Sequence, residues 1–337
     1  MSRIIGVKPP SAGAASAPPQ VRSLQVDAEA AGQRLDNFLV RCLKGVPKTH
    51  VYRIIRSGEV RVNKGRAAAD TRLAAGDVVR LPPVRTSATA EAKAARAAPA
   101  REFAVLLEDE HLLAIDKPAG VAVHGGSGVS FGVIEQLRQA RPEARFLELV
   151  HRLDRETSGI LLVAKRRSAL AHLQEQFRGR ATGKTYLALV LGDWPERLKV
   201  LDAPLKRYLL PTADGGEGER RVRVAAAGDA DAQRALSLVR VRERLRGFTL
   251  LEVTIKTGRT HQIRVHLASA GHPIAGDDKY GDFDTNKALH RQGLKRMALH
   301  AWRLQFNHPA HGERIELLSP PSADLQEFLT HVRTAPL

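Results

Sequence analysis

The sequence predicts an α+β protein with a mixed, mainly antiparallel, curved sheet flanked by helices, preceded by a smaller α/β domain. The chain has 337 residues, enough for two domains. A segment without long aliphatic or aromatic residues, at 86–100, separates a basic N-terminal part from the rest. Beyond this segment, strand-like and helix-like stretches interleave without a regular βαβ repeat, which favours a mainly antiparallel sheet.

Composition divides the chain into four parts. Residues 1–22 are rich in small residues and proline and lack periodicity, so we expect a disordered tail. We expect the small domain at 23–85, a linker at 86–100 and the large domain at 101–335. The chain has a single cysteine, Cys42, which excludes an intrachain disulfide and any site that needs several cysteines.

Two amphipathic helices open the small domain. Apolar residues from Leu35 to Leu43 recur at i, i+3, i+4, i+7 and i+8, which predicts a helix that ends near Gly45. A second helix opens at Pro47 and ends near Gly58, the kind of residue that commonly follows a helix. The stretch EVRVNKGR then alternates and turns, and GDVVRLP predicts a further short strand.

The large domain shows strands and helices in turn. FAVLLEDEHLLAIDK predicts two strands around an acidic turn, and SFGVIEQLRQAR predicts a helix. GILLVAKR and TYLALVLG predict buried strands with the helix HLQEQFRG between them, and FTLLEVTIKTG alternates as a strand. RTHQIRVHLASAG then predicts a helix with Thr260 as its N-cap and Gly271 at its end.

The charge balance favours a polyanionic partner. The chain has 53 Lys and Arg against 36 Asp and Glu, a net charge of +17. Residues 33–85 are the most basic part, although a solvated charged face would give the same composition. No apolar stretch approaches the ~20 residues of a membrane-spanning helix, and the start lacks an apolar signal segment, so we expect a cytoplasmic protein with no membrane partner.

The polar loop HRLDRETSG, at 151–159, precedes the apolar run ILLVAK and contains Asp154, the one carboxylate flanked as a reactive group would be. The residues alone leave two interpretations: a reactive loop, or a capped turn in which Asp154 and Thr157 bind backbone amides. Ser158 lacks the glycine elbow of a serine nucleophile. Glycine-rich nucleotide loops and metal-ligand spacings are also missing, so neither a cofactor nor a metal is expected.

Several motifs together resemble a known family. HRLDRETSGILLVAK, KTYLALV and TGRTHQIRVHLASAGHPIAGDDKYG follow one another, with KPAGVAVHGG before them, as in the RluA family of pseudouridine synthases. The two basic helices followed by GEVRVNKGR and AGDVVRLP resemble the S4 RNA-binding domain. The resemblance implies a pseudouridine synthase fold with an N-terminal S4 domain, and isomerisation of specific uridines to pseudouridine in 23S, or large-subunit, ribosomal RNA.

The resemblance also implies a role for Asp154 and two partners. Asp154 resembles the residue that lets a flipped uridine break its glycosidic bond and reattach through C5. Addition at C6, attack at C1′ and a glycal intermediate stay open, and we favour the glycal route. Arg264 resembles the cation that pairs with this carboxylate, and a nearby cation favours the ionised form. Tyr186 resembles the tyrosine that stacks on the base and shuttles a proton, although a lone strand tyrosine is commonly a core residue.

The remaining implied contacts are with RNA and the base. Arg152 resembles the arginine that enters the RNA stack where the uridine leaves. Ile263 and Leu267 are either apolar contacts near the base or core residues of their helix. In the S4 domain the implied RNA contacts are basic side chains, at Arg34, Lys48, Arg53, Arg56 and Lys64.

We therefore predict a monomeric enzyme that acts on 23S rRNA or a large-subunit assembly intermediate. One alternative is a ribosome-assembly factor that binds RNA without catalysis. Asp154, Tyr186 and Arg264 together argue against it, because RNA binding alone needs no buried carboxylate facing a phosphodiester. A second alternative is an S4-linked RNA methyltransferase, which would need a glycine-rich cofactor loop that the sequence lacks.

Overall fold

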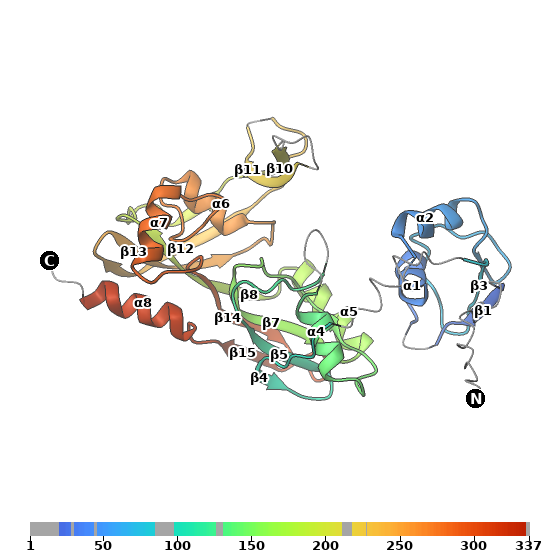
Figure 1. Cartoon of the computed structure of the whole chain (residues 1–337). Helices are drawn as coiled ribbons and strands as arrows, with labels where there is room; N and C mark the ends of the chain where they lie inside the picture. The colour runs from blue at the N-terminus through green and yellow to red at the C-terminus, as the bar shows by residue number, and fades with distance from the viewer. Residues whose placement is uncertain are drawn as a thin grey trace, which may run out of the picture. The chain divides into compact units, whose positions relative to one another are not determined.

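The computed structural model separates the chain into two compact units, Met1–Ala97 and Ala98–Leu337 (Figure 1). The structure describes residues 20–27, 30–43, 46–84, 98–125, 131–210, 218–226 and 228–334. Most of the predicted tail at 1–22 and of the predicted linker at 86–100 lies outside these ranges, as does Gly45. The expectations for those segments therefore stay predictions.

In the first unit, the two predicted helices are present as α1 (Leu35–Cys42) and α2 (Lys48–Arg56). Their apolar faces pack into one core, which is why the helical spacing of apolar residues was informative. Three short strands form an antiparallel sheet in the order β1-β3-β2, with bounds β1 (Arg22–Gln25), β2 (Arg61–Val62) and β3 (Val78–Leu81). Gly58 follows α2 with a φ of +74°, as expected of a glycine at a helix end.

The second unit is built on a ten-stranded sheet. The strand order is β4-β5-β7-β14-β8-β13-β12-β9, with β15 paired to β14 and β6 paired to β7. Every pairing is antiparallel except β7 with β14, so the predicted mixed, mainly antiparallel sheet is confirmed. Its strands are β4 (Ala104–Glu108), β5 (Leu112–Lys117), β6 (Glu148–Leu149), β7 (Ser158–Ala164), β8 (Gly183–Leu191), β9 (Val200–Asp202), β12 (Leu236–Leu245), β13 (Phe248–Ile255), β14 (Leu299–Asn307) and β15 (Arg314–Leu318).

Helices and one separate hairpin complete this unit. The hairpin pairs β10 (Leu205–Leu210) with β11 (Glu219–Val224), and in Figure 1 it projects from the rest of the unit. The helices are α4 (Val133–Ala140), α5 (Arg167–Arg178), α6 (Gln262–Ser269), α7 (Phe283–Arg291) and α8 (Ala323–Thr334). In the part of the chain that the structure describes, no helix is long and apolar enough to cross a membrane.

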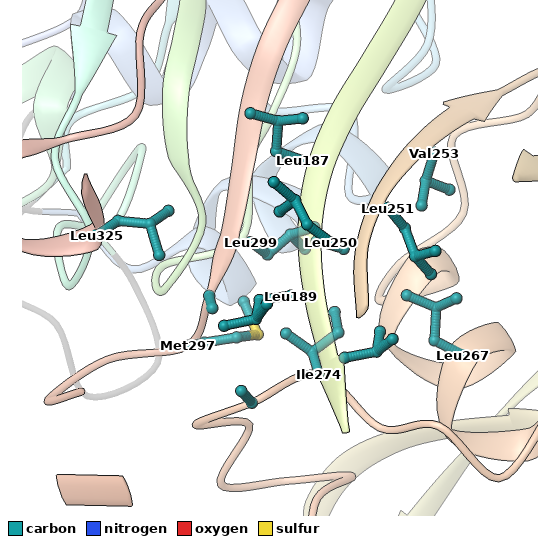
Figure 2. Packing of buried hydrophobic residues seen from close by; sticks show 14 of the residues in the cluster. Leu187, Leu189, Leu250, Leu251, Val253, Leu267, Ile274, Met297, Leu299 and Leu325 are labelled. Carbon is teal, nitrogen blue, oxygen red and sulfur yellow. The ribbon is translucent and has the colours of Figure 1, made fainter. Parts of the chain in front are cut away.

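The largest core lies where the central strands meet α6 and α8. Leu187 and Leu189 of β8 pack beside Leu250 of β13, with Leu267 and Leu325 contributed by the two helices (Figure 2). All five side chains are buried, so this cluster fixes α6 against the sheet. Because α6 carries Arg264, the same packing also fixes the position of the guanidinium.

The start of α6 differs from the prediction. Thr260 is not the N-cap; the N-cap is His261, in the left-handed conformation with a φ of +53°. The Thr260 hydroxyl instead accepts a hydrogen bond from Arg207 of β10 at 3.1 Å. A left-handed conformation of a residue other than glycine costs about 1–2 kcal/mol and persists only where other contacts impose it. The end of the helix agrees with the prediction, with Gly271 following it at a φ of +85°.

The start of β7 is held unusually close to β14. Gly159 has a φ of +108°, and a Cβ added there would lie 2.3 Å from the carbonyl oxygen of Ala301. Beside it, the Ser158 hydroxyl lies 2.8 Å from His300 Nδ1 and accepts a hydrogen bond from Arg296 at 2.6 Å. This contact anchors the C-terminal end of the polar loop 151–157 to the centre of the sheet.

Replacing Gly159 with alanine should therefore be strongly destabilising. The new methyl group would meet backbone rather than a flexible side chain, and the backbone conformation is unfavourable for any L-residue. We expect a loss of more than about 3 kcal/mol in the free energy of unfolding, measured by urea denaturation. Gly247→Ala is the matched control, because Gly247 has a φ of +73° with open space around it, and should lose only about 1–2 kcal/mol. Equal losses would contradict the close-approach argument.

Candidate functional site

The loop between β6 and β7 is held on both sides of Asp154. Before it, His151 Nε2 accepts the Leu162 backbone N–H at 3.1 Å, and the ring stacks on Phe177 with centroids 4.7 Å apart. Burial lowers the pKa of His151 to about 3, so the imidazole stays neutral and keeps accepting that bond. After it, the Thr157 N–H donates to the Asp154 carbonyl at 3.1 Å. The carboxylate is left to project from a fixed backbone.

Lys117 also fixes the loop that carries Asp154. Its side chain is fully buried, and Nζ donates to the carbonyls of Pro118, Val121 and Arg155 at 2.8, 2.8 and 3.0 Å. Burial lowers the pKa of Lys117 to about 7, against the opposing effect of nearby carboxylates. All three ammonium donors are satisfied by backbone, so Lys117 joins the residue after Asp154 to the loop that follows β5.

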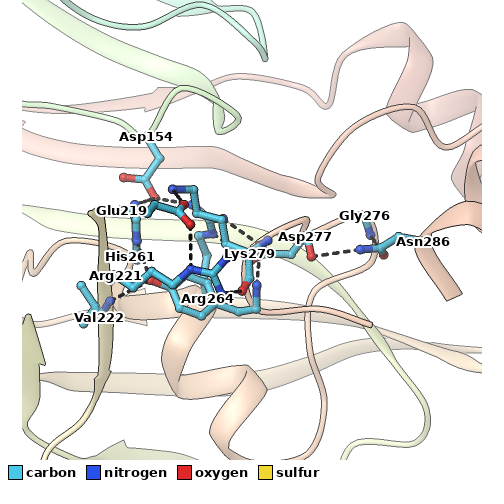
Figure 3. A network of polar contacts seen from close by, with 11 residues as sticks. Asp154, Glu219, Arg221, Val222, His261, Arg264, Gly276, Asp277, Lys279 and Asn286 are labelled. Carbon is cyan, nitrogen blue, oxygen red and sulfur yellow. Dashed lines mark hydrogen bonds and ion pairs between the residues drawn. The ribbon is translucent and has the colours of Figure 1, made fainter. Parts of the chain in front are cut away.

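Arg264 reaches Asp154, but its stronger partner is a second carboxylate. Arg264 Nη1 lies 3.4 Å from Asp154 Oδ2. Its Nε and Nη2 donate to the two carboxylate oxygens of Asp277 at 2.8 and 2.7 Å, a bidentate pair that is almost wholly buried (Figure 3). The predicted pairing of Asp154 with Arg264 is therefore one of two contacts in a triad of Asp154, Arg264 and Asp277. The capped-turn interpretation does not describe the Asp154 side chain, whose bonding partner among the described residues is Arg264.

Asp277 was missed in the sequence because it lies in a loop without periodicity. The backbone N–H groups of Lys279 and Tyr280 donate to its Oδ1 at 2.9 and 3.1 Å. Burial raises the pKa of Asp277, but hydrogen bonds and the charge of Arg264 outweigh it, so the net shift is downward. For Arg264, burial lowers the pKa while the bond to Asp277 raises it, and the net shift is upward. Both groups are charged, and each supports the charge of the other.

A third group faces Asp154 from the start of α6. His261 Nε2 lies 4.0 Å from Asp154 Oδ2, and His261 Nδ1 lies 2.7 Å from the Tyr280 hydroxyl. The Tyr280 oxygen also accepts the Val222 N–H at 3.1 Å, so Tyr280 links β11 to His261. Figure 3 shows His261 beside Asp154. Burial lowers the pKa of His261, which favours its neutral form. The left-handed backbone conformation of His261 directs its ring toward Asp154 and Tyr280.

These groups line one cavity. Its walls include Asp154, Arg152, Tyr186, Ile263 and His261. Burial, and then the charge of Asp154, raise the pKa of Tyr186, so the phenol stays protonated; its hydroxyl has no hydrogen-bond partner among the described residues. Arg152 is exposed at the rim. In the residues that the structure covers, no group of three or more potential ligands is suited to a metal ion.

The two apolar residues predicted near a base have different positions. Ile263 is buried and lines the cavity. Leu267 is fully buried in the core among the central strands and does not line the cavity (Figure 2). One helical turn separates the two positions, and at the second turn α6 faces the sheet. The core alternative therefore describes Leu267. Ile263 belongs to the same core and also lines the cavity, so its contact with a base stays a prediction.

The basic residues predicted in the first unit are mostly exposed. Arg53, Arg56 and Lys64 are exposed, the last in a left-handed turn with a φ of +68°. Arg34 is different, because Nε and Nη2 donate to the buried carboxylate of Asp36 at 3.2 and 2.7 Å. The side chain of Lys48 lies outside what the structure describes. Arg34 therefore has a structural partner, and the other three described side chains are open to solvent.

Comparisons with known proteins agree with this architecture. Residues 111–269 match the family described as RNA pseudouridylate synthase, and residues 33–79 match the S4 domain. Ribosomal large subunit pseudouridine synthase C of Yersinia pestis is 50% identical over 319 residues, 94% of this chain and 97% of that protein. The protein of that name from Escherichia coli (strain K12) is 50% identical over 322 residues, 94% and 98% respectively. The solved structure of Human RNA Pseudouridylate Synthase Domain Containing 4 is 28% identical, covering 68% of this chain and 93% of its own, with a TM-score of 0.55.

The triad predicts a large cost for removing Asp277. In Asp277→Asn the buried Arg264 guanidinium would lose its bidentate counter-charge, which typically costs about 3–5 kcal/mol in the free energy of unfolding. Asp278→Asn is the matched control, because Asp278 is the exposed neighbour. Urea denaturation of both variants at neutral pH measures the difference, and equal stability of the two would contradict the structural role.

The same pair gives the stability a pH dependence of known sign. Because the folded pKa of Asp277 is lowered, its contribution is present above the unfolded carboxyl pKa, about 3.9, and is lost as the pH falls through the folded value. The stability difference between the wild type and Asp277→Asn should therefore shrink as the pH falls below about 4.

Proposed function

The chain belongs to the RNA pseudouridine synthase family, and from this premise we propose that it converts specific uridines of large-subunit (23S) ribosomal RNA to pseudouridine. The names of its relatives and its S4 domain support ribosomal RNA of the large subunit, free or in an assembly intermediate, as the substrate. Isomerisation needs no external reactant, so the side chains of the site can supply the proposed chemistry.

One observation carries the proposal: a single carboxylate, Asp154, faces a cavity while Arg264 Nη1 lies 3.4 Å from its Oδ2. In the proposed reaction Asp154 assists cleavage of the bond between N1 of uracil and C1′ of ribose. The detached base rotates, C5 bonds to C1′, and the proton on C5 leaves while N1 gains one, so that no atom is lost. The glycal route is favoured, and the same carboxylate could serve addition at C6 or attack at C1′.

The other cavity residues fit a base that has left its stack. Extruding a nucleotide costs a few kcal/mol, and a planar guanidinium at the rim, such as Arg152, can occupy the vacancy and bind phosphate. Inside, Ile263 supplies an apolar wall and Tyr186 an aromatic face for stacking. Among the described residues the Tyr186 hydroxyl has no hydrogen-bond partner, so it is available to move the C5 proton.

The S4 domain is proposed to add affinity rather than chemistry. Its exposed cations, Arg53, Arg56 and Lys64, are suited to phosphate contacts. A factor that only binds RNA would need these cations but not the triad of Asp154, Arg264 and Asp277. Catalysis explains why a buried ion pair is maintained to orient a carboxylate at a cavity, and we therefore propose an enzyme. We also propose that the enzyme acts as a monomer.

Asp154→Asn should abolish isomerisation while changing RNA affinity no more than a few fold. The amide is nearly isosteric with the carboxylate but is not nucleophilic. Glu156→Gln is the matched control, since Glu156 is in the same loop and pairs with Arg155 at 3.2 Å rather than facing Arg264. Pseudouridine is mapped in 23S rRNA from cells that lack the protein and express the wild type or either variant. Pseudouridine restored by Asp154→Asn, or uridine sites unchanged by loss of the protein, would refute the assignment.

Tyr186→Phe tests the proton transfer separately from stacking. The hydroxyl has no hydrogen-bond partner among the described residues, so its removal should leave the free energy of unfolding almost unchanged. If the hydroxyl relays the C5 proton, the single-turnover rate should fall by about 10²- to 10⁴-fold, the range of general acid–base catalysis, with RNA affinity retained. A normal rate would assign Tyr186 to stacking alone.

A further inference from the structure

We propose that the groove between the α5–β8 turn and the β13–α6 loop binds the phosphate backbone of the RNA strand that leads to the target uridine. Arg180 and Lys184 are the proposed phosphate contacts. The inference rests on the proposed function, because it identifies the substrate there as RNA. It adds a binding surface in the large unit that is separate from the S4 domain.

The groove is continuous with the catalytic cavity and has one sign of charge. Asp154, Arg152 and Tyr186 line both, and the groove has a volume of about 750 Å³, in the range of ligand-binding clefts. Asp154 is its only lining carboxylate among the described residues. Seven lining residues are cationic: Arg152, Arg178, Arg180, Lys184, Arg207, Lys256 and Arg259. A cleft with walls of one sign concentrates counter-ions, and a strand ending at Asp154 is such a polyanion.

Lys184 lacks the partner that comparable lysines have. Lys165 and Lys206 are similarly half-buried, and each forms an ion pair, with Glu108 at 2.7 Å and Asp229 at 2.9 Å. Lys184 is not paired with any carboxylate in the described part of the chain. Its Nζ lies 5.4 Å from the centre of the Phe177 ring and faces the β13–α6 loop, where a Cβ added to Gly258 would lie 3.8 Å away.

The two cations also raise each other's electrostatic energy. Burial, and then the charge of Arg180, lower the pKa of Lys184, and no carboxylate opposes them. A pair of like charges that no residue neutralises is costly in the free protein. A phosphate between them would relieve the repulsion and supply the missing counter-charge.

Arg180 occupies a position where the fold favours glycine. Its φ is +59°, in the left-handed region that favours glycine. The neighbouring glycine, Gly179, precedes this position and does not occupy it. An arginine in this conformation costs about 1–2 kcal/mol relative to glycine. The Arg180 side chain is exposed and forms no hydrogen bond or ion pair with another described residue that would offset this cost. A requirement for the charge explains the arginine, whereas a requirement of the fold does not.

This strain makes Arg180→Gly an unusually sharp test. Glycine adopts the same φ without cost, so the variant should be as stable as the wild type or more stable. The same change removes one proposed phosphate contact, so RNA binding should weaken. Lys184→Gln is the second variant. Arg166→Gln is the control, because Arg166 is an equally exposed arginine at the other end of α5 that pairs with Glu110.

The measurements use the full chain and a 23S rRNA fragment that the wild type converts. The Kd is measured from 0.05 to 0.3 M salt, the free energy of unfolding by urea, and pseudouridine formation by single turnover. Each lost contact should reduce the slope of log affinity against log salt by about 0.7–0.9, and raise the Kd about sixfold at 0.1 M salt. The control should retain the slope and Kd of the wild type.

The outcomes separate the two proposals. Unchanged slopes in both Arg180→Gly and Lys184→Gln would overturn the groove assignment, as would a loss of stability in Arg180→Gly, which would indicate a structural role. Reduced slopes equal to that of the control would mean a general charge effect and would also overturn it. If the wild type forms no pseudouridine in any large-subunit RNA, the proposed function fails, and the same binding measurements on an unconverted 23S rRNA fragment still decide whether the groove contacts RNA.

Discussion

The bidentate pair between Arg264 and Asp277 is the interaction on which the site depends. A guanidinium has five N–H donors in a rigid plane, so two bonds to Asp277 fix the direction of the remaining edge. That edge points to Asp154. Asp277 already balances the charge of Arg264, so Asp154 is oriented by the guanidinium without being fully neutralised by it. A simple pair of Asp154 with Arg264 would have reduced the carboxylate's reactivity toward a substrate.

The same pair joins segments that are distant in the sequence. The backbone N–H groups that fix Asp277 belong to Lys279 and Tyr280, and Lys279 forms an ion pair with Glu219 of β11. Tyr280 accepts the Val222 N–H from the same strand and faces His261. Movement of the β10–β11 hairpin would therefore shift Asp277 and His261 together. The hairpin is connected to the site through these hydrogen bonds and through apolar packing of Leu205 and Val222 against Val265 of α6.

The local sequence pattern singled out Asp154, in a polar loop before an apolar strand, but left its role open between a reactive loop and a capped turn. The role of Asp154 and its pairing with Arg264 were implied by the resemblance to the pseudouridine synthase family. Asp277 could not be predicted in this way, because its role is set by a partner in another element and by backbone donors in an aperiodic loop. The place of His261 in the site depends on the folded chain, because its left-handed conformation and its contact with Tyr280 join residues 19 positions apart. Ile263 and Leu267 lie on the same helical face and belong to the same core, and only the lining of the cavity, which includes Ile263, distinguishes them.

The distribution of charges separates those that stabilise the fold from those left for a ligand. Buried or half-buried cations such as Arg264, Lys165 and Lys206 have carboxylate partners, and Lys117 has three carbonyls in their place. Desolvating a cation is costly, so a folded protein normally supplies such partners. Lys184, which lines the same groove as Asp154, is the exception, because no described carboxylate pairs with it. The cations behind the net charge of +17 therefore have different roles, since the paired ones stabilise the fold and an unpaired one is available to a ligand. The cations of the groove mark where the phosphates of a polyanion supply negative charge. Asp154, the single described carboxylate in the groove, marks where the RNA reacts.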